Sequence, residues 1–299
     1  MTTKTKEDAR SGQPQPAVEP LTHAPTTEPL SPLLKWAGGK RWQVPHIQPL
    51  WLASGATRLV EPFCGGLSVA LGLQPGRAVL NDVNEHLINF YRQVQAGRMA
   101  MVAMLAHDNT ESQYYRHRLR FNEIARATWT AYAQSPEAAA LFFYLNHTGF
   151  NGLCRFNSRG EFNVPYGKRK TVNYERAWDD YAVQLRGWSF FAGDFAAVPL
   201  ASGDFVYADP PYDVEFTTYS AGGFKWADQE RAAKWLAAHD GPVVLVNQAT
   251  PRIEALYRSL GFDISYLDAP RRISCNGDRT PAKEVFATRN IGHAIKAVA

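Results

Sequence analysis

The stretch from Thr57 to Asp82 reads TRLVEPFCGGLSVALGLQPGRAVLND and decides the expected fold. It opens with a short apolar run, passes through a turn that contains Gly65 and Gly66, and continues with a helical pattern from Leu67. A second apolar run then ends at Asp82. A strand, a glycine turn, a helix and another strand in this order form a βαβ unit, which implies a parallel sheet.

Strand patterns resume far along the chain, after a long interruption. Apolar runs lie at 188–191, 204–207 and 242–246, and helical patterns lie at 228–238 and 251–260. Two more segments, 262–268 and 284–289, are expected to close the sheet as an antiparallel pair. The sequence therefore predicts an α/β fold with a mixed, mostly parallel sheet.

The interruption between these patterns has a different character. It holds helical patterns at 111–127 and 136–147, followed by a loop-rich basic stretch. We therefore expect a core split into residues 33–95 and 187–290, with residues 96–186 inserted as a separate subdomain.

The two ends of the chain are expected to lie outside this core. Residues 1–32 are rich in Pro, Thr, Ser, Gln and Glu and contain no Phe, Trp or Tyr. Such a segment buries too little apolar surface to offset the entropy of ordering it, so we expect a disordered tail. It has neither the apolar run of a signal peptide nor the Arg-rich character of a transit peptide. Residues 291–299 are expected to form a short C-terminal tail.

Composition sets broad limits on the class of protein. The chain has 299 residues, of which 45% are hydrophobic and 12% aromatic, and its net charge is +4. These values exclude a protein that is disordered throughout, and no window approaches the ~18 apolar residues of a membrane span. Cys64, Cys154 and Cys275 are widely spaced and form neither a disulfide framework nor a Cys-x-x-Cys zinc pattern. We expect a cytoplasmic protein without a metal site.

The glycine turn and Asp82 suggest a nucleoside-type cofactor. Small residues between a strand and a helix let a ligand approach the backbone, and an acidic residue at the end of the next strand can reach ribose hydroxyls. Leu67 and Ser68 stand where the complete dinucleotide fingerprint has further glycines. From these residues alone, a cofactor turn and a purely structural turn both remain open.

A second motif, Asp209-Pro210-Pro211-Tyr212, follows the apolar run that ends at Ala208. Two prolines stiffen the backbone beyond the carboxyl end of a strand, where open α/β sheets bind ligands. A carboxylate, a backbone carbonyl and an aromatic face are thereby presented together. They suit a planar exocyclic amine, although a simple proline turn with one capping Asp is the structural alternative.

Residues 35–40, KWAGGK, form a tight glycine turn between two lysines. The turn is not a phosphate loop, because Leu34 occupies the first required glycine position and Arg41 replaces the Ser or Thr. An aromatic or anionic ligand fits these residues, as does a plain surface turn.

The stretch 146–170 is rich in Asn, Gly, Arg and aromatic residues. A turn at 158–160, between 154–156 and 162–164, predicts a hairpin with an exposed tip. Residues 151–176 hold six Lys or Arg and two Glu, a net charge of +4 that equals that of the whole chain. Arg and Asn can read base edges and Lys can contact phosphates, so we expect a DNA-binding hairpin rather than a merely solvated face.

Together these stretches resemble the Dam family of DNA adenine-N6 methyltransferases (alpha group, D12 class). The matching segments are LKWAGGK at 34–40, EPFCGG at 61–66, the run 142–170 with RGEFNVP at 159–165, and DPPY at 209–212. A fifth, ISCNG at 273–277, is similar to the family's segment near the carboxyl end. The resemblance covers about residues 32–290. It departs from the family at Gly66-Leu67, where many relatives have a small residue followed by glycine.

The resemblance implies a Rossmann-like S-adenosylmethionine-dependent methyltransferase core with an inserted helical and β-hairpin subdomain that recognises DNA. The cofactor would be S-adenosylmethionine, and the residues that bind it would be Trp36, Lys40, Phe63, Cys64, Gly65, Gly66, Asp82, Asp194 and Phe195. Asp82 would hold the ribose, Asp194 the adenine amino group of the cofactor, and Phe195 the face of that ring.

Catalysis would rest on Asp209, Pro210, Pro211 and Tyr212. Asp209 and the Pro210 carbonyl would accept hydrogen bonds from N6 of a flipped-out adenine, and Tyr212 would stack on its ring. We expect direct in-line methyl transfer without a covalent intermediate. The residues expected to contact DNA are Phe156, Asn157, Arg159, Asn163, Pro165, Lys168, Arg169 and Lys170, with GATC as the expected site.

Other functions remain open at this stage. Relatives that methylate cytosine N4 more often carry Ser at the position of Asp209, and those that act on RNA or protein glutamine usually carry Asn there. A homologue that binds DNA without turnover is the alternative outside enzymes. We expect a monomer that acts on double-stranded DNA in a prokaryote or phage, with no membrane partner; a cognate restriction endonuclease remains an open partner.

Overall fold

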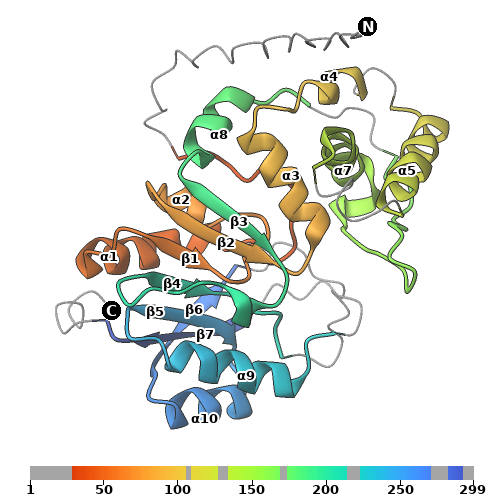
Figure 1. Cartoon of the computed structure of the whole chain (residues 1–299). Helices are drawn as coiled ribbons and strands as arrows, with labels where there is room; N and C mark the ends of the chain where they lie inside the picture. The colour runs from red at the N-terminus through yellow and green to blue at the C-terminus, as the bar shows by residue number, and fades with distance from the viewer. Residues whose placement is uncertain are drawn as a thin grey trace, which may run out of the picture.

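The computed structural model describes residues 29–105, 109–126, 134–168, 174–213, 223–270 and 282–291. Within these residues a seven-stranded sheet has the strand order β3-β2-β1-β4-β5-β7-β6 (Figure 1). The strands are β1 (Leu59–Glu61), β2 (Ala78–Asp82), β3 (Trp188–Ala192), β4 (Phe205–Ala208), β5 (Val243–Gln248), β6 (Asp263–Ala269) and β7 (Ala282–Arg289).

The strand directions confirm the mixed, mostly parallel α/β sheet. Strands β3, β2, β1, β4 and β5 pair in parallel, whereas β7 pairs antiparallel to both β5 and β6. The antiparallel pair expected at the end of the chain is therefore present. Because β7 runs against β5, the first residues of β7 lie beside the last residues of β5.

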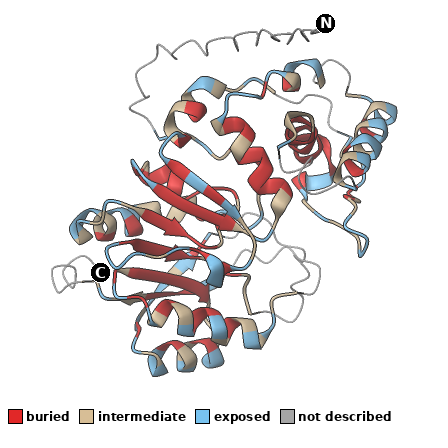
Figure 2. Cartoon of the chain, viewed as in Figure 1, coloured by how far each residue is buried: buried red, intermediate tan, exposed pale blue. Residues whose placement is uncertain are grey.

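Alternate side chains of the central strands enter two hydrophobic cores, one on each face of the sheet. Leu59 and Leu80 belong to the first core, and their neighbours Val60 and Val79 belong to the second. A strand points successive side chains to opposite faces, so a strand covered on both faces is apolar at nearly every position. Figure 2 accordingly shows the central strands as buried.

Helices cover both faces of the sheet. The second core is covered by α9 (Trp226–Ala237) and α10 (Pro251–Ser259). The first core is lined by α1 (Val44–Ser54), which follows η1 (Arg41–Gln43), and by α2 (Ala70–Leu73), α3 (Glu85–Gln95), α4 (Met101–Leu105), α5 (Glu111–Ala125), α7 (Pro136–Thr148) and α8 (Trp178–Leu185). In Figure 1, α5 and α7 lie beyond α3, away from the strands.

Helix α7 is the centre of a group of packed helices. Every residue from Ala138 to Thr148 is buried, as expected for a helix that is apolar on all sides. It packs against α3, α4 and α5. Its start is fixed by Ser135, whose hydroxyl accepts a hydrogen bond from the Ala138 N–H at 3.1 Å.

The structure differs from the sequence-based expectation in a few elements. Helix α1 was not expected because Pro45 and Pro49 interrupt its pattern; Pro45 is tolerated in the first turn, and Pro49 lies inside the helix. The expected hairpin is present, but among the described residues its arms join at two isolated bridges, Phe156 with Phe162 and Gly149 with Tyr166. Helix α8 falls where a loop was expected.

The start of the described chain is anchored to the rest of the protein. The Arg41 guanidinium donates hydrogen bonds to the carbonyl oxygens of Pro29 (3.1 Å) and Leu30 (2.7 Å), and the Tyr181 hydroxyl donates to Ser31 O (2.7 Å). Residues 29–32, placed in the tail by sequence, therefore make contacts. Residues 1–28, 292–299 and the segment 273–277 lie outside the described residues. The proposed division into a split core and an insertion stays a prediction.

Within the described ranges, the helices are too short or too polar to cross a lipid bilayer.

Candidate active site

The predicted cofactor and catalytic residues gather at one edge of the sheet. Strands β3, β2, β1 and β4 are neighbours and run in parallel, so their carboxyl ends meet there. The turns that follow them carry residues 62–66, Asp82, Asp194-Phe195 and 209–212. This is the edge at which open α/β sheets bind ligands.

Asn81 fixes the turns that follow β1 and β3. This buried side chain donates from Nδ2 to the carbonyl oxygens of Pro62 (3.0 Å) and Gly193 (3.1 Å). The Cys64 N–H in turn donates to Asn81 O at 2.8 Å. Asn81 thus links two turns that come from distant parts of the sequence, and the motif search did not identify it.

The glycines of the turn make room for Trp36. A Cβ atom at Gly66 would lie 2.8 Å from Trp36 Cβ, and one at Gly65 would lie 2.7 Å from Trp36 Nε1. Gly65 also has a φ of +44°. The predicted cofactor residues Trp36, Gly65 and Gly66 are therefore in direct contact, which explains why larger residues are absent here.

Asp82 lies beside the same turn, with both carboxylate oxygens engaged. Oδ2 accepts from the Gly65 N–H at 3.1 Å and Oδ1 accepts from the Asn84 N–H at 2.9 Å. Burial raises the pKa of Asp82, and the two backbone hydrogen bonds oppose that rise. The carboxylate is thereby oriented at the end of β2, where a ribose was predicted.

Glu61 is a buried carboxyl group that the sequence analysis did not single out. It ends β1, is 2% exposed, and its Oε1 atom has no hydrogen-bond partner among the described residues. Burial raises the pKa of Glu61 to about 8; a backbone hydrogen bond from Ala70 opposes the rise and Asp209 adds to it. An unpaired buried oxygen at this position suits a cationic ligand.

Asp194 and Phe195 form a second group with Arg231 of α9. Both terminal nitrogens of the guanidinium donate to the Asp194 carboxylate at 2.7 Å, which lowers the pKa of Asp194. The same guanidinium lies 4.2 Å from the centre of the Phe195 ring. Phe195 packs against Phe63, with 5.2 Å between ring centres. Arg231 is the part of this group that sequence reasoning missed.

Lys40, predicted to bind the cofactor, lies beside the catalytic motif. Its Nζ atom is 3.8 Å from Asp209 Oδ1 and 4.4 Å from the centre of the Tyr212 ring. Burial raises the pKa of Asp209 to about 7, while Lys40 opposes the shift and Glu284 adds to it. The geometry therefore joins Lys40 to the predicted amine-binding residues.

The loop that carries Pro210 and Pro211 is braced from α9 and β5. Gln229 Nε2 donates to the Pro211 carbonyl at 2.7 Å, and Asn247 Nδ2 donates to Gln229 Oε1 at 3.0 Å. Gln229 is 1% exposed and Asn247 0%. A further ion pair between Arg252 and Asp213 holds the residues that follow. The two prolines have no N–H groups to donate, so these contacts from α9, β5 and Arg252 hold the motif in place.

Two of the predicted DNA-binding residues shape the hairpin. Phe156 stacks on His86, with ring centres 4.6 Å apart and planes inclined by 13°. Asn157 Oδ1 accepts from the N–H groups of Arg159 (2.9 Å) and Glu161 (3.0 Å), which closes the turn. The Phe156 ring and the Asn157 amide are therefore already engaged within the protein.

The remaining described DNA-binding candidates lie at the surface. The Arg159 side chain is 78% exposed at the tip and pairs with Glu161 Oε2 at 3.1 Å. Asn163 Oδ1 accepts from Arg155 Nε at 2.8 Å, and Pro165 and Lys168 are exposed. Arg169 and Lys170, also predicted to contact DNA, lie outside the described residues.

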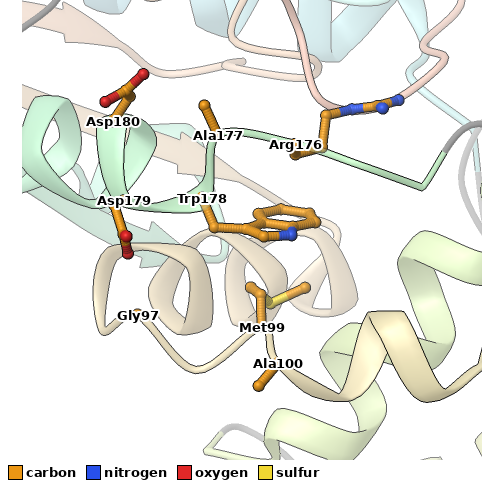
Figure 3. A pocket seen from close by; sticks show the side chains of 8 residues that line it. All are labelled: Gly97, Met99, Ala100, Arg176, Ala177, Trp178, Asp179 and Asp180. Atoms are coloured by element: carbon orange, nitrogen blue, oxygen red, sulfur yellow. The ribbon is translucent and has the colours of Figure 1, made fainter.

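A separate hollow of about 420 Å³ lies between the end of α3 and the start of α8. Figure 3 shows Trp178 and Met99 within it, and Asp179 and Asp180 on α8. None of the predicted site residues lines it.

The match to known proteins covers the site residues described above. The family model for D12 class N6 adenine-specific DNA methyltransferases matches residues 36–273. That range spans the glycine turn, the hairpin and the catalytic motif.

Individual relatives agree with this match. A DNA N-6-adenine-methyltransferase of Escherichia phage P1 is 38% identical over 88% of this chain, which spans 34% of that protein's length. The Retron Ec67 DNA adenine methylase of Escherichia coli is 34% identical, with 86% of this chain and 91% of that protein covered. The Type II methyltransferase M1.LlaDCHI of Lactococcus lactis subsp. cremoris is 35% identical, with 81% and 89% covered. The chain belongs to the D12 class of N6 adenine-specific DNA methyltransferases.

Proposed function

We propose that this protein transfers a methyl group from S-adenosylmethionine to N6 of an adenine that is flipped out of duplex DNA, within GATC. The observation that carries the proposal is the braced segment 209–212. Its Asp209 carboxylate lies beside Lys40 and the Tyr212 ring at the ligand-binding edge of the sheet.

The residues around the glycine turn fit the methyl donor. Asp82 is oriented at the end of β2 for ribose hydroxyls, and the unpaired Glu61 Oε1 suits the donor's ammonium group. The partly exposed Phe63 ring, which packs on Phe195, offers apolar surface for a planar base. When bound, S-adenosylmethionine supplies a methyl group activated by its sulfonium.

The catalytic segment would orient the target amine. Flipping an adenine out of the duplex costs a few kcal/mol, and stacking on Tyr212 returns about 1–3 kcal/mol. Hydrogen bonds from N6 to Asp209 and to the Pro210 carbonyl favour a more pyramidal nitrogen, whose lone pair then points at the methyl group.

Proton transfer also involves Asp209. As the bond from N6 to the methyl carbon forms, the nitrogen must lose one proton. A carboxylate with a pKa of about 7 is suited to accept it and to release it to water afterwards. Catalysis therefore depends mainly on how residues 209–212 position the target amine and on the charge of Asp209.

The hairpin would read the DNA sequence. Arg159 stands at its tip with most of its side chain exposed, and guanidinium groups pair in a bidentate manner with guanine in the major groove. Exposed Lys168 would contact phosphates, which position the duplex without specifying it. The Type II relative is the reason to test for a cognate restriction endonuclease.

The test is transfer of a labelled methyl group from S-adenosylmethionine to duplex DNA, with and without GATC. Nucleoside analysis of the product should show N6-methyladenine in the GATC duplex alone. Label in N4-methylcytosine would establish the cytosine enzyme instead, and DNA binding without any transfer would establish an inactive homologue. Adenine methylation at another sequence would support the proposed reaction but show that GATC is not the recognition sequence.

A further inference from the structure

Glu284 is a buried carboxylate that belongs to none of the sequence motifs. It lies on β7 opposite Gln248 of β5, and its side chain is 7% exposed. Lys40 Nζ donates to Oε1 at 2.9 Å, and Gln43 Nε2 donates to Oε2 at 2.8 Å. Because each oxygen has its own donor, the carboxylate is held in one orientation.

A further hydrogen bond links Glu284 to the strand that leads into the catalytic segment. The Tyr207 hydroxyl donates to Gln43 Oε1 at 2.8 Å. Tyr207 lies in β4, two residues before Asp209. Tyr207, Gln43 and Glu284 are all buried, so this chain of contacts runs through the interior from β4 to β7. Buried polar chains of this kind are rigid when every member is satisfied.

The position of Lys40 follows from this arrangement. Its 2.9 Å contact with Glu284 is a full hydrogen bond, whereas its 3.8 Å separation from Asp209 is too long for one. The ammonium therefore acts on Asp209 mainly through its charge, from a distance longer than a full hydrogen bond. Within the described part of the chain, these two carboxylates are the ones within 4.0 Å of Lys40.

Loss of the Glu284 charge would change the position of Lys40 between the two carboxylates. Asp209 would then be the remaining carboxylate within reach, and attraction between opposite charges grows as they approach. Lys40 would form a direct hydrogen bond to Asp209. That bond would occupy the oxygen that the target amine needs.

We propose that Glu284, held by Gln43, is a positioning residue for methyl transfer, because it keeps Lys40 beside Asp209 without letting it occupy the acceptor oxygen. The inference rests on the proposed function, since it assumes that Asp209 receives the adenine amine. It adds a residue of the last strand to the site, remote in sequence from the cofactor and catalytic motifs.

The charged and titratable groups that face Asp209 come from several elements. Lys40 favours its ionised form, whereas the negative charge of Glu284 disfavours it. Glu61 on β1, Tyr207 on β4, Tyr212 in the segment itself and Tyr257 on α10 also interact with it. Replacing Glu284 with Gln removes one negative charge and lets Lys40 approach. Both changes lower the pKa of Asp209.

The experiment compares wild-type protein with Glu284→Gln, Glu284→Asp and Asp204→Asn. It measures kcat/KM for a GATC duplex between pH 5.5 and 9 at saturating S-adenosylmethionine. Asp204→Asn is the matched control: Asp204 is also a buried carboxylate, paired with Arg58, but it lies just before β4, at the opposite end from Asp209. A merely structural role of Glu284 would affect both variants alike.

We expect Glu284→Gln to lower the plateau of kcat/KM about tenfold or more, the effect of losing a buried charge-assisted hydrogen bond. Its acid limb should move to lower pH by about half a unit or more. Glu284→Asp should restore part of the plateau, and Asp204→Asn should leave the limb in place. A Glu284→Gln enzyme with the wild-type plateau and limb would overturn the inference. Absence of adenine methylation by the wild-type protein would instead refute the proposed function.

A second variant covers the case in which Glu284→Gln does not fold. Tyr207→Phe removes one hydroxyl from the far end of the chain of contacts and keeps the ring. We expect its kcat/KM to fall a few-fold, with the acid limb shifted in the same direction. Unchanged values for this folded variant would overturn the inference.

Discussion

The ammonium nitrogen of Lys40 lies 3.8 Å from Oδ1 of Asp209, at the edge where four parallel strands end. The lysine comes from a turn that precedes the sheet, and the aspartate follows the fourth strand of the chain. Their approach places a cation next to the carboxylate that the proposed reaction uses as an acceptor. Burial nevertheless affects the pKa of Asp209 more than this cation does, and the pKa is raised to about 7.

The raised pKa of Asp209 predicts an acid limb in the activity profile. The acceptor must be ionised, so kcat/KM for DNA should rise as pH increases through about 7 and then level off. The measurement is initial methylation rate at low DNA concentration and saturating S-adenosylmethionine. DNA affinity, measured separately over the same pH range, should not show this step. A profile that is flat between pH 6 and 8 would contradict the assignment.

Glu61 predicts a pH dependence of stability. Its pKa rises from the ordinary 4.5 to about 8 on folding, so the folded protein holds this proton more tightly than the unfolded chain does. Stability should therefore fall as pH increases from about 4.5 to about 8. Glu61→Gln lacks this loss and should gain on the order of 5 kcal/mol over wild type across that range. Urea unfolding at pH 5 and pH 8.5 checks it; an equal difference at both pH values would argue against the raised pKa.

Gly66 and Trp36 predict a steric effect at the cofactor turn. A methyl group at position 66 would lie 2.8 Å from Trp36 Cβ, so Gly66→Ala should cost about 1–3 kcal/mol and weaken S-adenosylmethionine binding. Gly76→Ala is the control, because nothing lies within 4 Å of a Cβ there. In a Trp36→Gly background, which lacks that Cβ atom, Gly66→Ala should cost less stability than it does in the wild type. Equal losses in the two glycine variants would show that the contact with Trp36 is not the cause.

The hairpin predicts different effects for two basic residues. Arg159→Ala should cost about 1–3 kcal/mol of discrimination at one base pair, because a guanidinium reads a base edge. Lys168→Ala should weaken binding to all sequences about equally and lower the salt slope by about one. Methylation of GATC and of its single-base variants, with binding at several salt concentrations, separates the two. A uniform loss for Arg159→Ala would make it a phosphate contact.

Much of the fold could be predicted from sequence because the core strands are apolar on both faces. Runs such as 242–246 consist almost entirely of apolar residues, and the turns between elements are marked by Gly and Pro. Helix α1 was not predicted, because its two prolines obscure the helical pattern, although the helix tolerates both. The hairpin turn could be foreseen, but not that isolated bridges join its arms within the described residues, because the arms pack against His86 and Asn122.

The candidate site was predictable where its residues follow a strand. Asp82 and Asp209 stand at such positions, and their neighbours in the sequence identify them. Glu284 could not be found in this way, because it begins a strand and reaches the site only through the antiparallel pairing of β7 with β5. Arg231 and Gln229 are helix residues whose roles depend on tertiary contacts alone.

The most direct test of the central claim is the single-turnover rate of methyl transfer by Asp209→Ala, at saturating DNA and S-adenosylmethionine. The variant should bind both ligands within a few-fold of wild type, yet transfer should slow by about 10²–10³-fold or more, because the oriented acceptor for the target amine is gone. Near-normal transfer by the folded Asp209→Ala protein would contradict the account.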